Sequence, residues 1–263
     1  MMIHDRVSTS VGLPSRIQTL IHWIEAAPVI TPQLAEQYVQ AAKIEAEDLQ
    51  PWADFDHPVA DSYGRHLVYD GGNFEVMVMS WAPGDFSAIH DHGAAQWGAV
   101  QSFGAAEHSV FCLDQMQLST VSVHPFPAGS VNAVDSDLIH QMGNPSHQPF
   151  LSLHVYGSSN HTGAVTGDAR IFDLYEHSIL YTDGGVFFGM PADQVTSQVQ
   201  GLQGDAPTTQ RHHQQMLLRI YRRLASGENT TRLWQAATIL RQQISDLQMA
   251  TMVEFNTSSP SAL

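Results

Sequence analysis

A series of short β-prone runs through the middle of the chain limits most strongly how it can fold. Between about residues 60 and 190, runs of β-branched and aromatic residues alternate with Gly, Pro, Asn and Asp. The first two runs, SYGRHLVY and FEVMVMSW, are separated by DGGN, which is typical of a hairpin turn. The pattern continues through AQWGAVQSF, EHSVFCL, LSTVSVHPF, GSVNAV, FLSLHVYG and GVFFGM. Such spacing predicts a mainly β fold, an antiparallel barrel or sandwich.

Helical periodicity precedes the β-rich section. Residues 15–27 place apolar side chains on one helical face, and Pro28 ends this run. A second helix is expected to begin with Thr31 as its N-cap and Pro32 at its first position, and to run to about Asp48. We expect both helices to pack on the β-domain.

Helical periodicity returns after a polar linker that we expect at about 197–208. One helix is predicted to end at Gly227, and another to begin at Asn229 and to run to about residue 248. Their apolar stripes indicate core or dimer contacts, so a monomer or a small homo-oligomer formed through these helices is expected. The predicted boundaries are an N-terminal helical segment (1–50), a β-domain (51–196) and a C-terminal helical extension with a tail (197–263).

Composition restricts the partners. The net charge is −15 and Lys43 is the single lysine, so the surface repels phosphate backbones and anionic lipids. We therefore expect neither nucleic acid nor membrane as a partner. One cysteine, Cys112, rules out an intramolecular disulfide and any multi-cysteine metal site. The sequence shows no signal-like N-terminal segment and no run of 18 apolar residues, which favours a soluble, cytoplasmic protein.

The segment GDFSAIHDHG carries two histidines one residue apart. On a strand, residues i and i+2 point to the same face, so His90 and His92 can aim both imidazoles at one point. Alone, the motif fits two histidines on a polar strand face equally well. Downstream, PAGSVNAVDSDLIHQMGN contains Pro-x-Gly and then His140. The two segments resemble the two halves of a cupin metal motif, and this resemblance makes His140 the third ligand.

The motif departs from that of ordinary cupins, which supply a glutamate shortly after the second histidine. Gln96 and Trp97 occupy those positions, and neither can be an anionic ligand. Three neutral imidazoles leave the metal complex cationic, so an anionic thiolate is an attractive additional ligand for iron. The alternative for three histidines is zinc with a bound water, as in a hydrolase or hydratase.

Two further segments carry polar residues on one strand face. In SLHVY, Ser152, His154 and Tyr156 share a face, as a hydrogen-bonded relay near the metal or simply as a polar face toward water. In YGRHLV, Tyr63 and Arg65 share a face. A guanidinium inside a barrel is costly unless it is paired, and it is suited to clamping a substrate carboxylate. A surface arginine paired with an acidic residue is the other explanation.

Together, YGRHLV, WAPGDFSAIHDH, DSDLIHQMGN and SLHVYGSS resemble, in order and interval, the signature segments of the cysteine dioxygenase (thiol dioxygenase) family of cupins. The resemblance implies a jelly-roll barrel over the β-rich section, with iron(II) as the cofactor. Trp81 matches a tryptophan that the family has just before the metal strand, which implies a structural or supporting role for it. The implied roles are iron ligands for His90, His92 and His140, carboxylate binding for Arg65 and Tyr63, and a place beside the thiolate and dioxygen for Tyr156, oriented by His154 and Ser152.

The chain departs from mammalian members of this family at one position. There, a cysteine on the strand after His-x-His is crosslinked to the tyrosine. Counted from His92 without gaps, Trp97 stands in that place, and Cys112 lies too far along to replace it. We therefore expect no Cys–Tyr crosslink, as in bacterial relatives that share the glycine after His-x-His, here Gly93. Trp97 either contacts the substrate and suits the pocket to a larger thiol, or packs away from it.

The resulting expectation is an iron(II)-dependent enzyme that oxidises a small carboxylate-bearing thiol, most simply cysteine, with O2 to a sulfinic acid. The alternatives are a divergent three-histidine iron cupin that oxidises another thiol or a related sulfur or amino-acid compound, and a metal-binding cupin without catalysis. Six further histidines match no motif position and are expected on the surface: His108, His124, His147, His161, His212 and His213.

Overall fold

The computed structural model describes residues 12–159, 164–188 and 190–258, with side chains described up to residue 250. Its helices are α1 Ser15–Ala26, α2 Pro32–Ala42, α3 Ala46–Leu49, α4 Ala206–Ala225 and α5 Thr231–Ser258, with short 3-10 turns at Gln50–Trp52, Val59–Asp61 and Ala192–Gln194. Its strands are β1 Gly64–Asp70, β2 Phe74–Trp81, β3 Trp97–Ser102, β4 Ala106–Asp114, β5 Gln117–Phe126, β6 Val131–Asp135, β7 Ile139–Gly143, β8 Phe150–Gly157, β9 Ala169–Asp173, β10 Ser178–Thr182, β11 Val195–Gln200 and β12 Gln203–Gly204. Within these residues, no helix is long and apolar enough to cross a membrane.

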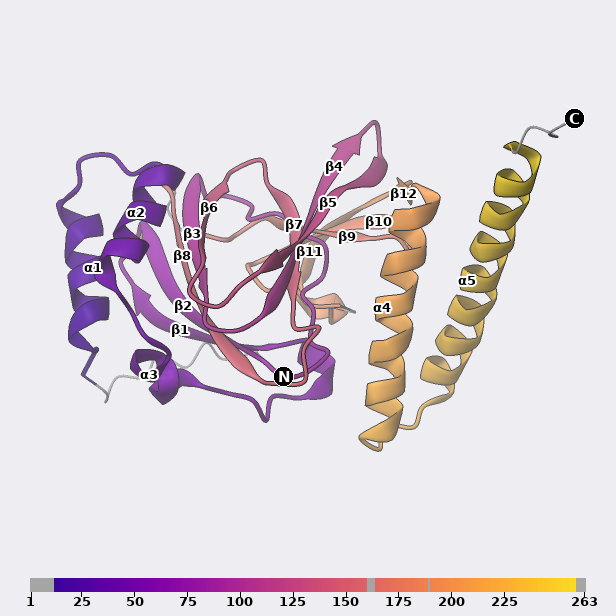
Figure 1. Ribbon diagram of the computed structural model, residues 1–263, viewed down its shortest axis with the longest axis horizontal. Helices are drawn as coiled ribbons and strands as arrows, with labels where there is room; N and C mark the ends of the chain where they lie inside the picture. The colour runs from indigo at the N-terminus through magenta and orange to yellow at the C-terminus, as the bar shows by residue number, and fades with distance from the viewer. Residues whose placement is uncertain (1–11, 160–163, 189, 259–263) are drawn as a thin grey trace, which may run out of the picture.

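The strands form a curled double sheet between two helical layers (Figure 1). One sheet has the order β1-β2-β8-β3-β6, and the other side is built from β12-β5-β4-β7 and β11-β10-β9. Residues 86–90 join the last two groups, because Phe86 and His90 form bridges to β7 while His90 also bridges to Ile171 of β9. The prediction of a mainly β cupin barrel with helices at both ends is confirmed.

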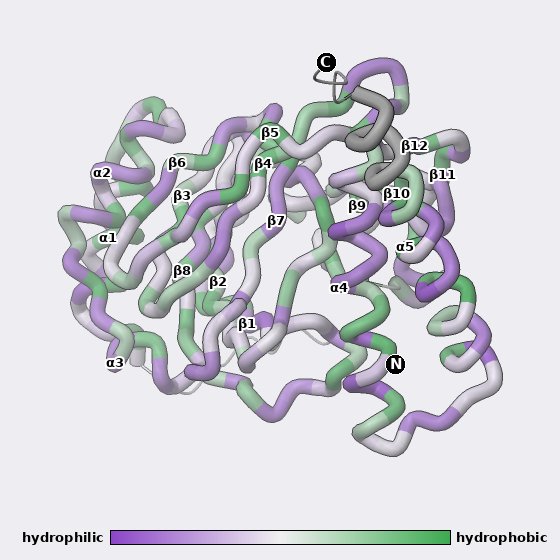
Figure 2. Tube along the Cα trace, turned by 45° about the vertical axis from the view of Figure 1, so that its right-hand side comes forward, coloured by the Kyte–Doolittle hydropathy of each residue, from purple (hydrophilic) through white to green (hydrophobic). Residues whose placement is uncertain are grey.

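The N-terminal helices cover the outer face of the five-stranded sheet. Hydrophilic and hydrophobic residues alternate along α1 and α2 (Figure 2), as expected for helices with one buried side. Thr31 caps α2 as predicted, accepting a hydrogen bond from the Leu34 amide at 3.2 Å. The second helix is shorter than predicted, because Lys43 adopts a left-handed conformation and ends α2, after which the chain starts α3.

Two segments differ from the sequence-based expectation. Residues 185–188, predicted as a strand, form an irregular loop whose Val186 and Phe187 are buried against the barrel interior. The expected linker at 197–208 overlaps β11, which pairs with β10 although its side chains are largely exposed. An apolar run predicts burial but not backbone conformation, and an exposed edge strand gives little hydrophobic signal.

The C-terminal helices form a hairpin at the opposite end of the molecule from α1 and α2 (Figure 1). Helix α4 contacts β5, β12 and the turn at Val59–Asp61, whereas α5 packs against α4. Gly227, with φ of +96°, ends the first helix as predicted, and Thr230 rather than Asn229 caps the second through the Leu233 amide. The hairpin is therefore joined to the barrel through α4.

Strand alternation separates two buried regions. On β8, Leu151, Leu153 and Val155 face the cluster under α1 and α2. Phe150 and Tyr156 face the barrel interior. The interior side also receives Met77, Met79 and Trp81 from the neighbouring β2, so it combines sulfur and aromatic side chains with the polar residues of the candidate site.

Candidate active site

A pocket inside the barrel collects most of the predicted site residues. Its empty volume, with the open solvent at its mouth included, is about 460 Å³. The predicted residues in its walls are Tyr63, Arg65, His90, His92, His140, His154 and Tyr156. Ser152 does not line the pocket but forms a hydrogen bond with His154, which does.

The backbone brings His90 and His140 directly opposite each other. Each residue's amide donates to the other's carbonyl oxygen at 2.9 Å. The His90 Nδ1 lies 2.9 Å from the Ala88 carbonyl oxygen, so this nitrogen carries the hydrogen and Nε2 is left with its lone pair. The chain around His90 forms isolated bridges rather than the regular strand assumed from the His-x-His pattern.

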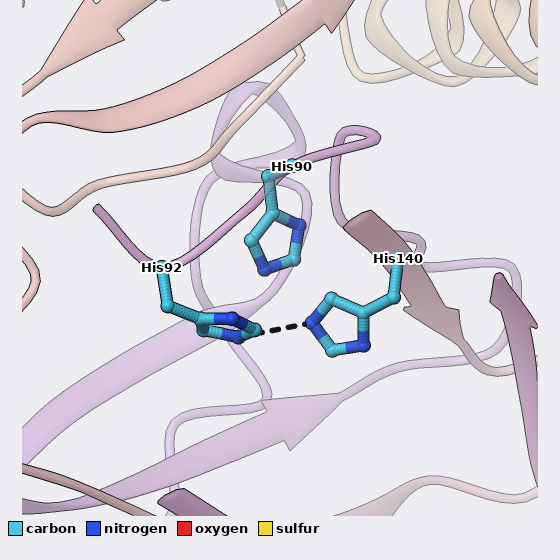
Figure 3. A group of neighbouring side chains, drawn as sticks. All are labelled: His90, His92 and His140. Atoms are coloured by element: carbon cyan, nitrogen blue, oxygen red, sulfur yellow. Dashed lines mark hydrogen bonds between the residues drawn. The ribbon is translucent and has the colours of Figure 1, made fainter. Parts of the chain in front are cut away.

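The three imidazoles converge on one point (Figure 3). One nitrogen of each lies within 4.8 Å of the others, and the Nε2 atoms of His92 and His140 are 3.1 Å apart. Burial lowers the pKa of all three histidines, and for His92 and His140 it does so strongly. Neutral imidazole is the form that binds divalent metals, so the group fits a metal ion.

No carboxylate joins this group within the part of the chain that the structure describes. Gln96 instead accepts a hydrogen bond from the Ser159 amide at 2.9 Å. Asp91, between the two histidines, is buried: one carboxylate oxygen accepts from the Gly93 and Arg170 amides and the other pairs with the Arg170 Nε. It holds the His-x-His loop onto β9. The donor set is therefore three imidazoles.

A chain of hydrogen bonds leads from Trp81 to the pocket. The Trp81 indole donates to Ser152 Oγ at 2.8 Å, Ser152 Oγ lies 2.8 Å from His154 Nε2, and His154 Nδ1 lies 2.9 Å from the Tyr156 hydroxyl. All four side chains are buried. The relay prediction for the SLHVY strand thus has the required geometry.

This relay also assigns protons. If Ser152 donates to His154 Nε2, then His154 Nδ1 carries the hydrogen and donates to the Tyr156 oxygen. The Tyr156 O–H is then directed away from the relay. Burial lowers the pKa of His154 to about 3 and raises that of Tyr156, so both side chains are neutral near pH 7. The Tyr156 ring lies 4.7 Å from that of His92, centroid to centroid.

The sheet that carries the relay on β8 also carries, on and next to its edge strand β1, the two residues predicted to clamp a carboxylate. Arg65 is at the start of β1, and Tyr63 immediately precedes this strand. The Tyr63 ring stacks on Trp81 with centroids 4.8 Å apart, and burial raises its pKa to about 12. Burial is the main cause of both pKa shifts; the positive charge of Arg65 adds to the lowering of the His154 pKa and offsets part of the rise in the Tyr156 pKa. A cationic and a neutral hydrogen-bonding side chain therefore share the pocket with the three histidines.

Trp97 is not in this pocket. Its indole packs in the cluster beneath α1 and α2, beside Phe74, and lies over Gly157. The structure therefore removes Trp97 from the predicted substrate contacts. The residue beside the tyrosine is Gly98, where an added Cβ would come within 2.5 Å of Tyr156 Cδ1. Cys112 is exposed and free, in keeping with the absence of a Cys–Tyr crosslink.

Several residues of the site were missed in the sequence. Met77, Met79 and Met142 line the pocket, and alternation along FEVMVMSW could have placed the first two on the side of Trp81. His108 was expected on the surface but is half-buried, with Nε2 2.8 Å from His140 Nδ1. Its partner lies on another strand, so no local pattern indicates the contact.

The other histidines divide into two groups. His124 and His147 are exposed, as predicted. His212 and His213 are buried on the side of α4 that faces the barrel, against Phe188 and Tyr175, so their assignment to the surface was wrong. They pack as part of the helix contact, which the sequence alone does not specify. His161 lies outside the described residues.

Comparisons with known proteins agree with this site. The family model for cysteine dioxygenase type I matches residues 2–162. Cysteine dioxygenase type 1 of Danio rerio is 26% identical over 160 residues, which are 56% of this chain and 77% of that protein. The Homo sapiens enzyme is 25% identical over 145 residues, 52% and 70% of the two chains.

Among solved structures, an uncharacterized conserved protein with a double-stranded beta-helix domain from Klebsiella pneumoniae matches 44% of this chain and 90% of its own. At 17% identity and a TM-score of 0.34, this likeness supports no argument about function. The family match covers more than half of the chain and includes the three-histidine group. The chain therefore belongs to the cysteine dioxygenase type I family and is a non-heme dioxygenase.

Proposed function

We propose that the protein is an iron(II)-dependent thiol dioxygenase that acts on a small thiol bearing a carboxylate, with cysteine as the first candidate. The observation that carries this proposal is the presence of three convergent imidazoles, a guanidinium and a buried tyrosine relay in one small pocket. The overall reaction adds both atoms of O2 to the thiol sulfur, so that a thiol and O2 give one sulfinic acid. All atoms and electrons are then accounted for without another reductant.

Iron(II) would be held by His90, His92 and His140, and when bound it supplies the redox chemistry that lets O2 react with sulfur. Three neutral imidazoles add no negative charge, so they leave an anionic thiolate as a favoured partner for the cation. A metal-binding protein without catalysis has no use for Arg65 and the Tyr156 relay on the same pocket wall.

Arg65 would bind the substrate carboxylate through two parallel N–H donors. Its side chain lines the pocket that the three histidines share, so this contact also aims the substrate's other end toward them. Tyr63, held against Trp81, supports the same wall. Binding the carboxylate at one end and the sulfur at the other selects thiols of matching length.

Tyr156 would donate its O–H to the substrate sulfur or to the sulfinate oxygens that form. In the tautomer with the hydrogen on His154 Nδ1, the Tyr156 oxygen accepts from His154, which leaves the hydroxyl hydrogen for this purpose and fixes its direction. The methionine and aromatic lining formed by Met77, Met79 and Trp81 excludes water around these groups and strengthens their hydrogen bonds.

The direct test is oxygen uptake by anaerobically prepared, iron(II)-loaded protein with a set of thiols. L-cysteine, cysteamine, which lacks the carboxylate, and 3-mercaptopropionate, which lacks the amine, separate the contributions of the two groups. Mass spectrometry with isotopically labelled O2 should show a product heavier than the thiol by two oxygen atoms, both from O2. Uptake with 3-mercaptopropionate but not cysteine would keep the chemistry and change the substrate. Absence of uptake with every thiol, at full iron loading, would refute the proposal.

A further inference from the structure

The third histidine of the metal group has a partner of its own on a neighbouring strand. Strand β4 pairs with β7 so that Val110 stands opposite His140 and His108 stands opposite Met142. His108 and His140 are therefore diagonal neighbours on the same face, close enough for two imidazoles to touch. His108 Nε2 lies 2.8 Å from His140 Nδ1, and the rings meet edge to face with centroids 5.0 Å apart.

Proton placement between the two rings follows from which nitrogen faces the other ligands. The His140 Nε2 points toward His92, as Figure 3 shows, so it must keep its lone pair to bind a metal. A neutral imidazole carries one hydrogen, which then sits on Nδ1. His140 Nδ1 therefore donates to His108 Nε2, and His108 carries its own hydrogen on Nδ1.

The three ligands differ in what holds their outer nitrogen. The His90 Nδ1 donates to the Ala88 carbonyl oxygen, a backbone acceptor next to it in the chain. The His92 Nδ1 has no hydrogen-bond partner among the described residues. For His140 the acceptor is the His108 side chain, so it alone depends on a residue that mutation can remove without altering the backbone.

The two strands that carry His108 and His140 are fixed from outside the barrel by helix α4. Glu107 and Ser109, which flank His108, both bond to Arg211 of α4. Gln141, which follows His140, exchanges two hydrogen bonds with Gln215 of α4, of 2.9 and 3.0 Å. Alternation sends these flanking side chains outward and the two histidines inward, so the helix holds the register that brings the histidines together.

We propose that His108 is a positioning residue of the metal centre, which accepts the Nδ1 hydrogen of His140 and thereby fixes the tautomer and ring plane of this ligand. The proposal rests on the proposed role of the three histidines in binding a metal. Partners of this kind raise ligand basicity, and their removal typically weakens metal binding by about 10- to 100-fold.

The test uses Co²⁺ alone as the probe, because its visible absorption reports the ligand field and needs no turnover. His108→Leu removes the acceptor at similar size, whereas His108→Gln offers a side-chain carbonyl in its place. His147→Leu makes the same replacement at an exposed histidine. We expect His108→Leu to raise the Co²⁺ dissociation constant about 10- to 100-fold and to alter the spectrum. His108→Gln should recover most of the affinity, and His147→Leu should match wild type.

Two outcomes overturn the role of His108 while leaving the metal site intact: wild-type affinity and spectrum in His108→Leu, or equal losses in the leucine and glutamine variants. Failure of wild-type protein to bind Co²⁺, or binding that persists unchanged in His140→Ala, would instead overturn the proposed metal site. Should His108→Leu fail to fold, nitrogen-15 NMR of the Zn²⁺-loaded wild type reads the tautomer directly. A hydrogen on His108 Nδ1 supports the proposal, and one on Nε2 refutes it.

Discussion

The two faces of strand β8 are both buried, yet they have different roles. One face carries Ser152, His154 and Tyr156, whose polar atoms bond to one another and to Trp81. The other presents apolar side chains, including the fully buried Leu153, to the cluster under α1 and α2. Because alternation separates them completely, substitutions on the pocket face should change chemistry, and substitutions on the helix face should change stability.

The largest effect is expected from His140→Ala on the pocket side. Losing one of three ligands should abolish iron binding and with it all oxygen uptake, because two imidazoles hold the metal too weakly. Iron content after gel filtration, together with uptake of O2, measures both. The free energy of unfolding, measured on protein freed of metal by a chelator, should change little. Retained iron with normal turnover would contradict the assignment of His140 as a ligand.

Leu153→Ala tests the face of β8 that packs against α1 and α2. Leu153 is fully buried, so its truncation should lower the free energy of unfolding by about 2–5 kcal/mol. Denaturant unfolding measures this change, and turnover of the folded fraction should stay near wild type. Leu218→Ala, at a side chain 64% exposed, is the control and should stay within about 0.5 kcal/mol. Lost turnover in the folded protein would show that the two faces are coupled.

Tyr156→Phe removes a single oxygen atom from the pocket face. We expect turnover to fall by roughly 100-fold, the lower end of what a positioned proton donor contributes, while iron stays bound. Tyr38→Phe makes the same change in the cluster under the helices and should leave turnover unaltered. Steady-state oxygen uptake compares the two, and an unchanged rate in Tyr156→Phe would return the SLHVY relay to a structural role.

Arg65→Ala tests the end of the pocket that would hold the carboxylate. Loss of hydrogen bonds to a charged group should raise KM for cysteine by about 10- to 100-fold, with a smaller change in kcat. Uptake with cysteamine, which has no carboxylate, should respond much less. Equal losses with both thiols would mean that Arg65 supports the pocket wall rather than the substrate.

The last prediction concerns pH. Burial lowers the pKa of His154 to about 3, so the unfolded state binds a proton at a higher pH than the folded state. In protein freed of metal by a chelator, the contribution of His154 to the free energy of unfolding should be fully present above about pH 6.5. It should be lost as the pH falls toward 3, by at most about 1.4 kcal/mol per pH unit. Chemical unfolding at several pH values gives the slope. It should become shallower in His154→Gln and stay the same in Leu218→Ala, which changes no titratable group.

Patterns within one strand predicted this site well. Alternation alone put Ser152, His154 and Tyr156 on one face, and the structure shows them bonded in a row. The resemblance between four short segments and the cysteine dioxygenase family predicted His90, His92 and His140 as metal ligands and Arg65 as a carboxylate contact, and the structure brings these four side chains to one pocket. Local sequence suffices here because each motif lies within a few residues.

Local sequence patterns did not predict which residues of different strands lie next to each other. Counting from His92 without gaps pointed to Trp97, but the turn at Gly93, with φ of +56°, and the irregular residues after it shift the phase of β3. As a result Gly98 faces Tyr156 and Trp97 faces the helices. The His108–His140 contact depends in the same way on how β4 pairs with β7. Register is decided by the assembled sheet.

The paired amides of Gln141 and Gln215 connect the C-terminal extension, which lies beyond the residues matched by the family, to the residue after a metal ligand. Thermodynamic linkage makes such a connection work in both directions. The factor by which docked α4 raises the metal affinity of the site is also the factor by which a bound metal strengthens the docking of α4. Loading the site with metal would then stabilise the attachment of α4 to the barrel, although no residue of α4 lines the pocket.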